Sequence, residues 1–146
     1  MNLSEHFTLE EFTRSSTANE IGNDNSPTPE HLENLTQTAA GMELVRSACG
    51  NVPVTVTSGY RNPVVNSAVG GVPNSDHALG WACDFHINGL TPIQAASHIE
   101  VAEIKYDQLI HETSRDILHI SFNPRMRQEA LTQAGGPGTP FTKGIP

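Results

Sequence analysis

The stretch Ser75-Asp76-His77-Ala78-Leu79-Gly80-Trp81-Ala82-Cys83-Asp84-Phe85-His86-Ile87 leads from a polar loop into a segment that alternates like a β-strand. Side chains of a strand point alternately to its two sides, so residues 81–87 can be sorted into two rows. The apolar row comprises Trp81, Cys83, Phe85 and Ile87. Asp84 and His86 lie in the other row. The stretch therefore predicts a strand that packs its apolar row into a core and presents Asp84 on the opposite face.

A second segment with the same pattern, residues 116–122, carries a histidine on its polar side. Its apolar face comprises Leu118, Ile120 and Phe122. His119 lies on the other face. The segment follows a predicted strand over 107–112, and the short turn between the two indicates a hairpin. If strands 81–87 and 116–122 belong to one sheet, Asp84 and His119 project from the same surface.

His77 supplies a third possible ligand, because it lies in the loop seven residues before Asp84. Two imidazole nitrogens and one carboxylate oxygen, with a fourth position left for water, form a ligand set of catalytic zinc sites. A zinc ion in such a site lowers the pKa of its bound water toward about 7 and polarises a carbonyl group. His77, Asp84 and His119 therefore form a candidate site for one catalytic Zn²⁺ ion.

The remaining patterns predict an α+β fold, with a small, mostly antiparallel sheet and helices packed on one side. A further strand is expected over 52–57, where β-branched residues alternate. N-cap signals predict helices that end near Arg14, that cover 29–48 and 63–68, and that start at Thr91-Pro92; a helical stub is expected near 125–132. The helix after Thr91 is expected to bury Ile93, Ala96, Ile99 and Val101 or Ala102. Loops are expected over 15–27 and 70–74.

Length, composition and charge indicate one domain with no affinity for nucleic acid. The chain has 146 residues, and we expect a single domain over 1–132 and a flexible Gly/Pro-rich tail over 133–146. Its 16 acidic and 8 basic residues give a net charge of −8, which argues against binding to nucleic acid or to a membrane surface. The N-terminus has no signal-peptide pattern, so we expect synthesis in the cytoplasm. We also expect the protein to be a monomer.

Several motifs together resemble one peptidase family. The motifs are Ser75-x-His77-x6-Asp84, Leu118-His119-Ile120-Ser121 and Ser58-Gly59-Tyr60-Arg61. They are similar to those of the zinc D-alanyl-D-alanine carboxypeptidases and L-alanyl-D-glutamate endopeptidases, which cut peptidoglycan stem peptides and share a hedgehog-like peptidase fold. The resemblance runs from about Phe7 to Leu131, and the nearest type is the small stand-alone enzyme of phages and prophages.

The resemblance implies a role for each candidate site residue. His77, Asp84 and His119 would hold the zinc ion. Arg61 would bind the substrate's carboxylate or polarise its carbonyl, which suits the two-donor fork of a guanidinium. Ser75 would bond near the substrate or support the ligand loop. Two alternatives stay open: Arg61 could cap a turn, and Ser75 could be an ordinary loop hydroxyl.

The general base has two candidates, because the family places an acidic residue a few positions before the last zinc histidine. Asp116 lies three residues before His119, and Glu112 lies seven before it. A base must come within about 3 Å of the attacking water or act through one more water. A hairpin could bring either residue near, and the Glu-x-x-His-like spacing favours Asp116. His86 and His111 are possible neighbours of the site or ordinary strand histidines.

The function implied is a zinc peptidase that hydrolyses peptidoglycan stem peptides, such as a phage endolysin that reaches the cell wall after release. The enzyme is expected to be of the D-Ala-D-Ala carboxypeptidase or the L-Ala-D-Glu endopeptidase type. The alternative from another class is a catalytically inactive, zinc-stabilised module that binds the wall or builds a phage particle. Within enzymes, a wall-remodelling carboxypeptidase or a cytoplasmic dipeptidase would also fit.

Overall fold

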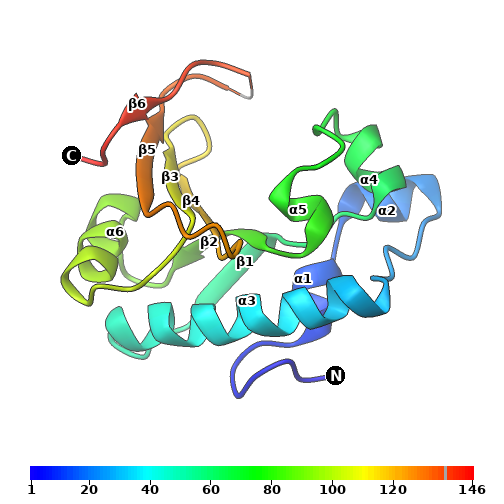
Figure 1. Ribbon diagram of the computed structural model, residues 1–146, viewed down its shortest axis with the longest axis horizontal. Helices are drawn as coiled ribbons and strands as arrows, with labels where there is room; N and C mark the ends of the chain where they lie inside the picture. The colour runs from blue at the N-terminus through cyan, green and yellow to red at the C-terminus, as the bar shows by residue number, and fades with distance from the viewer. Residues whose placement is uncertain (137) are drawn as a thin grey trace.

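The computed structural model describes residues 1–136 and 138–146, whose strands form one mixed sheet (Figure 1). The strands are β1 (Val54–Ser58), β2 (Ala82–Ile87), β3 (Gln108–Glu112), β4 (Ile117–Ser121), β5 (Glu129–Gln133) and β6 (Thr142–Lys143). Their order across the sheet is β1-β2-β4-β3-β5-β6, and within the described residues only the β3–β5 pair is parallel. The predicted α+β fold with a mostly antiparallel sheet is therefore confirmed.

The helices of the described residues all start at a polar N-cap whose side chain accepts a hydrogen bond from a backbone N–H of the first turn. They are α1 (Leu9–Thr13), α2 (Ser16–Ile21), α3 (Pro29–Ala48), α4 (Pro63–Ala68), α5 (Asp76–Leu79) and α6 (Pro92–Val101). Helices α1, α3, α4 and α6 match predicted helices. None of the described helices combines the length and the apolarity that crossing a membrane requires.

The apolar face of the sheet packs against α3 and α6, which run along its lower side in Figure 1. The buried cluster on this face includes Phe85, Leu118, Ile120, Leu35, Met42 and Ile99. The opposite face of β2 and β4 carries Asp84 and His119, as the alternation predicts, and the two residues are direct partners in the antiparallel register. The core thus fixes the strands from one side and leaves the polar face available for a site.

The buried side of α6 differs from the prediction. Pro92, Ala95, Ala96 and Ile99 are buried, whereas Ile93 and Val101 are exposed. The buried positions still follow the three- and four-residue steps of a helix, but the stripe runs through the small alanines. Small side chains allow a close approach between the helix and the sheet, which the larger apolar residues would prevent.

The loop expected over 15–27 contains α2, so that prediction is wrong. Ser15 caps the helix by accepting a hydrogen bond from the backbone N–H of Ala18. Gly22 ends it with a φ of 70°, in the left-handed region that glycine adopts without strain. The segment is polar, but its caps suffice to close a short helix against α4.

The helical stub expected near 125–132 is wrong, because residues Glu129–Gln133 form β5 beside β3. Met126 and Gln128 have left-handed φ values of 43° and 56°, which are incompatible with a continuous helix. Asp107 fixes this bend by accepting hydrogen bonds from the backbone N–H and the side chain of Arg127. The segment expected as a flexible tail over 133–146 also contributes to the sheet, since β6 pairs with β5.

Gly59, just after β1, is expected to reject a side chain. A Cβ added there would lie 2.5 Å from the carbonyl oxygen of Phe12, which is backbone and cannot turn aside. We expect Gly59→Ala to lower the free energy of unfolding by about 1–3 kcal/mol, as overpacking does, in a urea titration. Gly136→Ala is the matched control, because a Cβ at Gly136 meets nothing within 4 Å; equal stability losses in the two variants would contradict the prediction.

Candidate functional site

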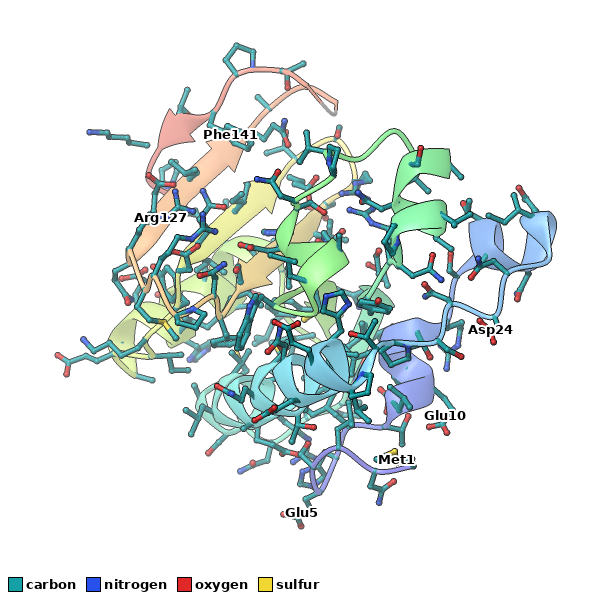
Figure 2. The ribbon with its side chains drawn as sticks, turned by 45° about the vertical axis from the view of Figure 1, so that its right-hand side comes forward. Met1, Glu5, Glu10, Asp24, Arg127 and Phe141 are labelled. Atoms are coloured by element: carbon teal, nitrogen blue, oxygen red, sulfur yellow. The ribbon has the colours of Figure 1, made fainter. Side chains whose placement is uncertain are left out.

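The polar face of the sheet forms the floor of a cavity of about 720 Å³. Asp84, Ile110, His119 and Gln133 line the floor from four neighbouring strands. One wall comes from α5 and the loop before it, and the other comes from the segment that follows β4. Arg127 and Phe141, labelled in Figure 2, belong to this second wall. The cavity therefore unites segments from both halves of the chain.

The three candidate metal ligands meet in this cavity. His77 comes from α5, Asp84 from β2 and His119 from β4, and their ligand atoms all lie within 4.8 Å of one another. Asp84 Oδ1 is 3.2 Å from His77 Nε2 and 2.9 Å from His119 Nδ1. One carboxylate oxygen and two imidazoles thus face a common point. This donor set fits a zinc ion, as the spacing predicts.

The orientation of His77 is set by the loop after β1. Its Nδ1 donates a hydrogen bond of 2.7 Å to the carbonyl oxygen of Gly59, so this nitrogen carries a proton. Nε2, which faces Asp84 at 3.2 Å, is therefore the nitrogen that would ligate zinc. A backbone carbonyl that fixes the tautomer of a metal histidine in this way is a common supporting contact.

Charge holds the three residues together in the protein without a metal. Burial disfavours the Asp84 anion, but the charges and hydrogen bonds of His77 and His119 outweigh this effect and hold the pKa of Asp84 well below its usual value. Burial likewise disfavours the charged form of His119, yet the hydrogen bond and charge of Asp84 raise its pKa. The cluster therefore keeps an anion in a buried position, as a cation site requires.

Arg61 lies beside these ligands, in the loop between β1 and α4, and lines the same cavity. Its backbone N–H donates to the carbonyl oxygen of His77 at 3.1 Å. The side-chain Nε is buried and has no hydrogen-bond partner among the described residues. Burial lowers the pKa of this guanidinium from its ordinary value, although the nearby Asp84 charge opposes the shift. A buried donor without an acceptor is a suitable contact for a polar substrate group.

Ser75 has a structural contact that accounts for its hydroxyl. It is the N-cap of α5, and its Oγ accepts a hydrogen bond of 3.2 Å from the backbone N–H of Ala78. The same Oγ donates to Asn66 Oδ1 at 3.3 Å. Ser75 also lines the cavity, but these bonds support the short helix that carries His77. These contacts favour support of the ligand loop among the roles considered for Ser75, and its role in substrate binding stays a prediction.

The two candidate bases lie in different places. Glu112 lines the cavity from the end of β3, and its side chain is 13% exposed. Asp116 is absent from the cavity lining drawn from the described residues, and its side chain is 76% exposed. Asp116 Oδ1 instead lies 3.4 Å from Nε2 of His111, which alternates away from Glu112 along β3. The site thus brings Glu112, and not Asp116, toward the metal ligands.

The cavity contains three arginines besides Arg61, and the sequence patterns assign none of these three to the site. Four of the chain's eight basic residues line it, namely Arg61, Arg115, Arg125 and Arg127. Arg115 Nη2 lies 2.5 Å from Glu112 Oε1 and 3.4 Å from Asp84 Oδ2, so it bridges the base candidate and a metal ligand. The negative net charge of the whole chain conceals this local concentration of arginines. In the sequence, the three-residue spacing from Glu112 to Arg115 is the one sign of their ion pair.

A second polar network ties the ligand-bearing elements together. Asp76, next to His77, accepts hydrogen bonds from Ser121 Oγ at 2.6 Å and Asn123 Nδ2 at 2.9 Å. Arg125 bridges Asp76 and the buried Asp107. These contacts link α5 to the end of β4, on which His119 lies. His86, by contrast, is exposed on β2 and outside the metal cluster.

Comparison with known proteins places these features in context. A model of the family described as Peptidase M15 matches residues 5–121, which is most of the chain. A zinc D-Ala-D-Ala carboxypeptidase from Streptomyces albus G is 44% identical over 43 residues, or 30% of this chain. The match spans only 17% of the length of that relative.

Proposed function

This chain belongs to the peptidase M15 family, and from that premise we propose that it is a zinc-dependent peptidase that hydrolyses peptidoglycan stem peptides. The observation that carries the proposal is the convergence of His77, Asp84 and His119 on one point in an open cavity. The name of the Streptomyces relative, a zinc carboxypeptidase that acts on D-Ala-D-Ala, supports both the metal and the substrate class.

In the proposed reaction, His77, Asp84 and His119 hold one Zn²⁺ ion. When bound, the ion supplies a lowered pKa for a water molecule and polarisation of the scissile carbonyl. Glu112 accepts a proton from the attacking water and returns it to the leaving amine. Its place in the cavity, beside the metal ligands, supports it over Asp116.

Arg61 and Ser75 have different parts in this proposal. Arg61 offers its buried and unbonded Nε to a carboxylate or carbonyl oxygen of the substrate. A preorganised donor aimed at developing negative charge stabilises the transition state. Ser75 holds α5, and with it His77, in place. Arg115 bonds to the Glu112 carboxylate and keeps that side chain within the cavity.

We propose further that the enzyme acts on the cell wall as a small phage-type endolysin. The motifs that resemble the stand-alone phage enzymes support this role. The bond cleaved is either D-Ala-D-Ala, with release of free D-alanine, or L-Ala-D-Glu, with a cut after L-alanine. Mass spectrometry of the products from purified muropeptides distinguishes the two, because each bond gives fragments of different mass.

Removal of the metal tests the proposal. We expect a chelator to abolish hydrolysis of muropeptides and added Zn²⁺ to restore it, because the attacking water and the carbonyl both depend on the ion. Product release is followed by liquid chromatography, with a chelator pre-saturated with zinc as the control. Hydrolysis that continues in chelator would refute the zinc peptidase. Metal binding without hydrolysis would favour the zinc-stabilised wall-binding or phage structural module.

A further inference from the structure

Several hydrogen bonds hold the loop that carries Arg61, residues 59–62, and among them the Tyr60 N–H donates to the Phe12 carbonyl at 2.6 Å. His77 Nδ1 donates to the Gly59 carbonyl, and the His77 carbonyl accepts from the Arg61 N–H. Asn25 makes two further contacts, one on each side of Arg61. Its Nδ2 donates to the Tyr60 carbonyl at 2.8 Å, and its Oδ1 accepts from the Asn62 N–H at 2.9 Å. Asn25 therefore bonds to the backbone on both sides of Arg61.

Asn25 is suited to this position by its backbone and by its side chain. It is 1% exposed, and its φ of 53° lies in the left-handed region, where asparagine is enriched. The amide offers two donor hydrogens and one acceptor oxygen. The second donor bond reaches the Thr13 carbonyl at 2.9 Å, so the amide also joins the end of α1 to the loop. A carboxylate of the same shape would place oxygens against two carbonyls.

We propose that Asn25 is a positioning residue for substrate binding and acts through Arg61. The inference rests on the proposed function, in which Arg61 contacts the substrate. A guanidinium recognises a planar anion only within a narrow range of positions, so the backbone that carries it must be fixed. Asn25 fixes both peptide units that flank Arg61. Its neighbour Asp24 is exposed on the outside of the molecule (Figure 2). Asn23 Oδ1 accepts a hydrogen bond from the Asn62 side chain at 2.7 Å, so it contacts the loop but not the backbone beside Arg61.

A double-mutant cycle with Asn25→Gly and Arg61→Gln tests the inference. Glycine keeps the left-handed backbone without strain and removes only the amide. On the zinc-loaded full chain, we expect Asn25→Gly to raise the KM for a stem peptide ending in D-Ala-D-Ala about tenfold, equivalent to about 1.4 kcal/mol. In the Arg61→Gln background the same change is expected to have less than about a twofold effect, because the residue through which Asn25 acts is gone.

Controls separate positioning from general stability. Asn51→Gly is the matched variant, since Asn51 also has a positive φ, of 58°, but is exposed and lies before β1, whereas the loop follows β1. It is expected to leave KM unchanged. Hydrogen exchange of the metal-free chain gives a readout independent of activity, and Asn25→Gly is expected to speed exchange of the Asn62 N–H. Zinc content and folded fraction are matched before each assay.

Each outcome bears on the inference. The inference is overturned if Asn25→Gly raises KM equally in the natural chain and in the Arg61→Gln variant. It is also overturned if Asn25→Gly leaves the KM of the natural chain unchanged. Asn25→Ser also removes the amide but places no carboxylate against the Thr13 and Tyr60 carbonyls, and it is used if the glycine variant does not fold. Failure of both to fold would also overturn it, because Asn25 would then support the whole domain. If the unsubstituted protein cleaves no stem peptide, the proposed function fails. The double-mutant cycle is then measured as dissociation constants for the stem peptide by calorimetry. Absence of binding to the unsubstituted protein counts against the inference.

Discussion

Glu112→Gln is expected to lower kcat for stem-peptide hydrolysis by about 10²–10⁴-fold, the usual contribution of a general base. Glutamine keeps the shape of the side chain and can still accept a hydrogen bond, but it cannot take a proton at neutral pH. The site favours this residue because Glu112 lines the cavity from β3, on the face that carries the metal ligands. The measurement is steady-state kinetics on muropeptides, with the zinc content of each variant determined beforehand.

Asp116→Asn is the matched control for this experiment. Asp116 has a left-handed φ of 52° in the turn between β3 and β4, a conformation that asparagine also adopts readily. Its side chain is largely exposed, so we expect kcat to change less than about twofold, as for surface substitutions generally. The opposite pattern, with full activity in Glu112→Gln and loss in Asp116→Asn, would restore Asp116 as the base.

The contrast between these two residues shows where sequence reasoning about the site ends. The spacing of Asp116 from His119 resembles a Glu-x-x-His pattern, but such spacing specifies a common face only if the secondary structure between the residues is known. Asp116 lies in a turn, and its left-handed backbone directs the carboxylate toward His111. Glu112 and His119 lie on neighbouring strands that share one face, and that relation depends on the register of the hairpin.

The metal ligands could be predicted because alternation within single strands determines their side. Asp84 and His119 each point to the side of the strand opposite an apolar row, and pairing of β2 with β4 brings them opposite one another. An apolar neighbour such as Phe85, which is buried on the core side, indicates that the adjacent Asp84 points to the opposite face. Arg115 and Asp76 gave no such signal, because one lies in a turn and the other in a one-turn helix.

The fold was predictable where a local pattern extends over many residues. Helix α3 has twenty residues and clear signals at its start, so its bounds agree with the prediction. Strand β5 has no long pattern of its own. It forms because Arg127 bonds to Asp107 and the following residues align with β3, which are contacts between distant parts of the chain. Pairing of this kind depends on tertiary structure that a local window does not contain.

Asp84→Asn is expected to weaken zinc binding by more than about 100-fold, beyond the usual cost of losing a supporting contact to a metal ligand. The amide removes the anionic oxygen that faces both His77 and His119, while the volume of the side chain is kept. Hydrolysis is expected to fall with zinc occupancy. Affinity is measured by competition with a chromophoric chelator. His86→Ala is the control, since His86 lies on the same strand but outside the cluster.

Asp84→Asn is also expected to lower the stability of the metal-free protein, and the loss is expected to depend on pH. The pKa of Asp84 is lowered from 3.8, so its contribution to stability is present above that value and is lost as the pH falls through the depressed pKa. The pKa of His119 is raised from 6.5, so its contribution is present below 6.5 and is lost as the pH rises through the raised pKa. The ion pair is therefore fully effective between about pH 3.8 and 6.5.

Zinc and protons compete for this site, which gives the prediction a second test. A histidine must be neutral to bind zinc, and Asp84 raises the pKa of His119 in the metal-free protein. We therefore expect the zinc affinity of the natural chain to increase with pH until His119 has lost its proton. In Asp84→Asn the pKa of His119 is expected to fall, although the charges of Glu112 and Asp76 still raise it, and the increase in zinc affinity is expected to shift to lower pH. An affinity profile with the same midpoint in both proteins would show that Asp84 does not control the protonation of His119.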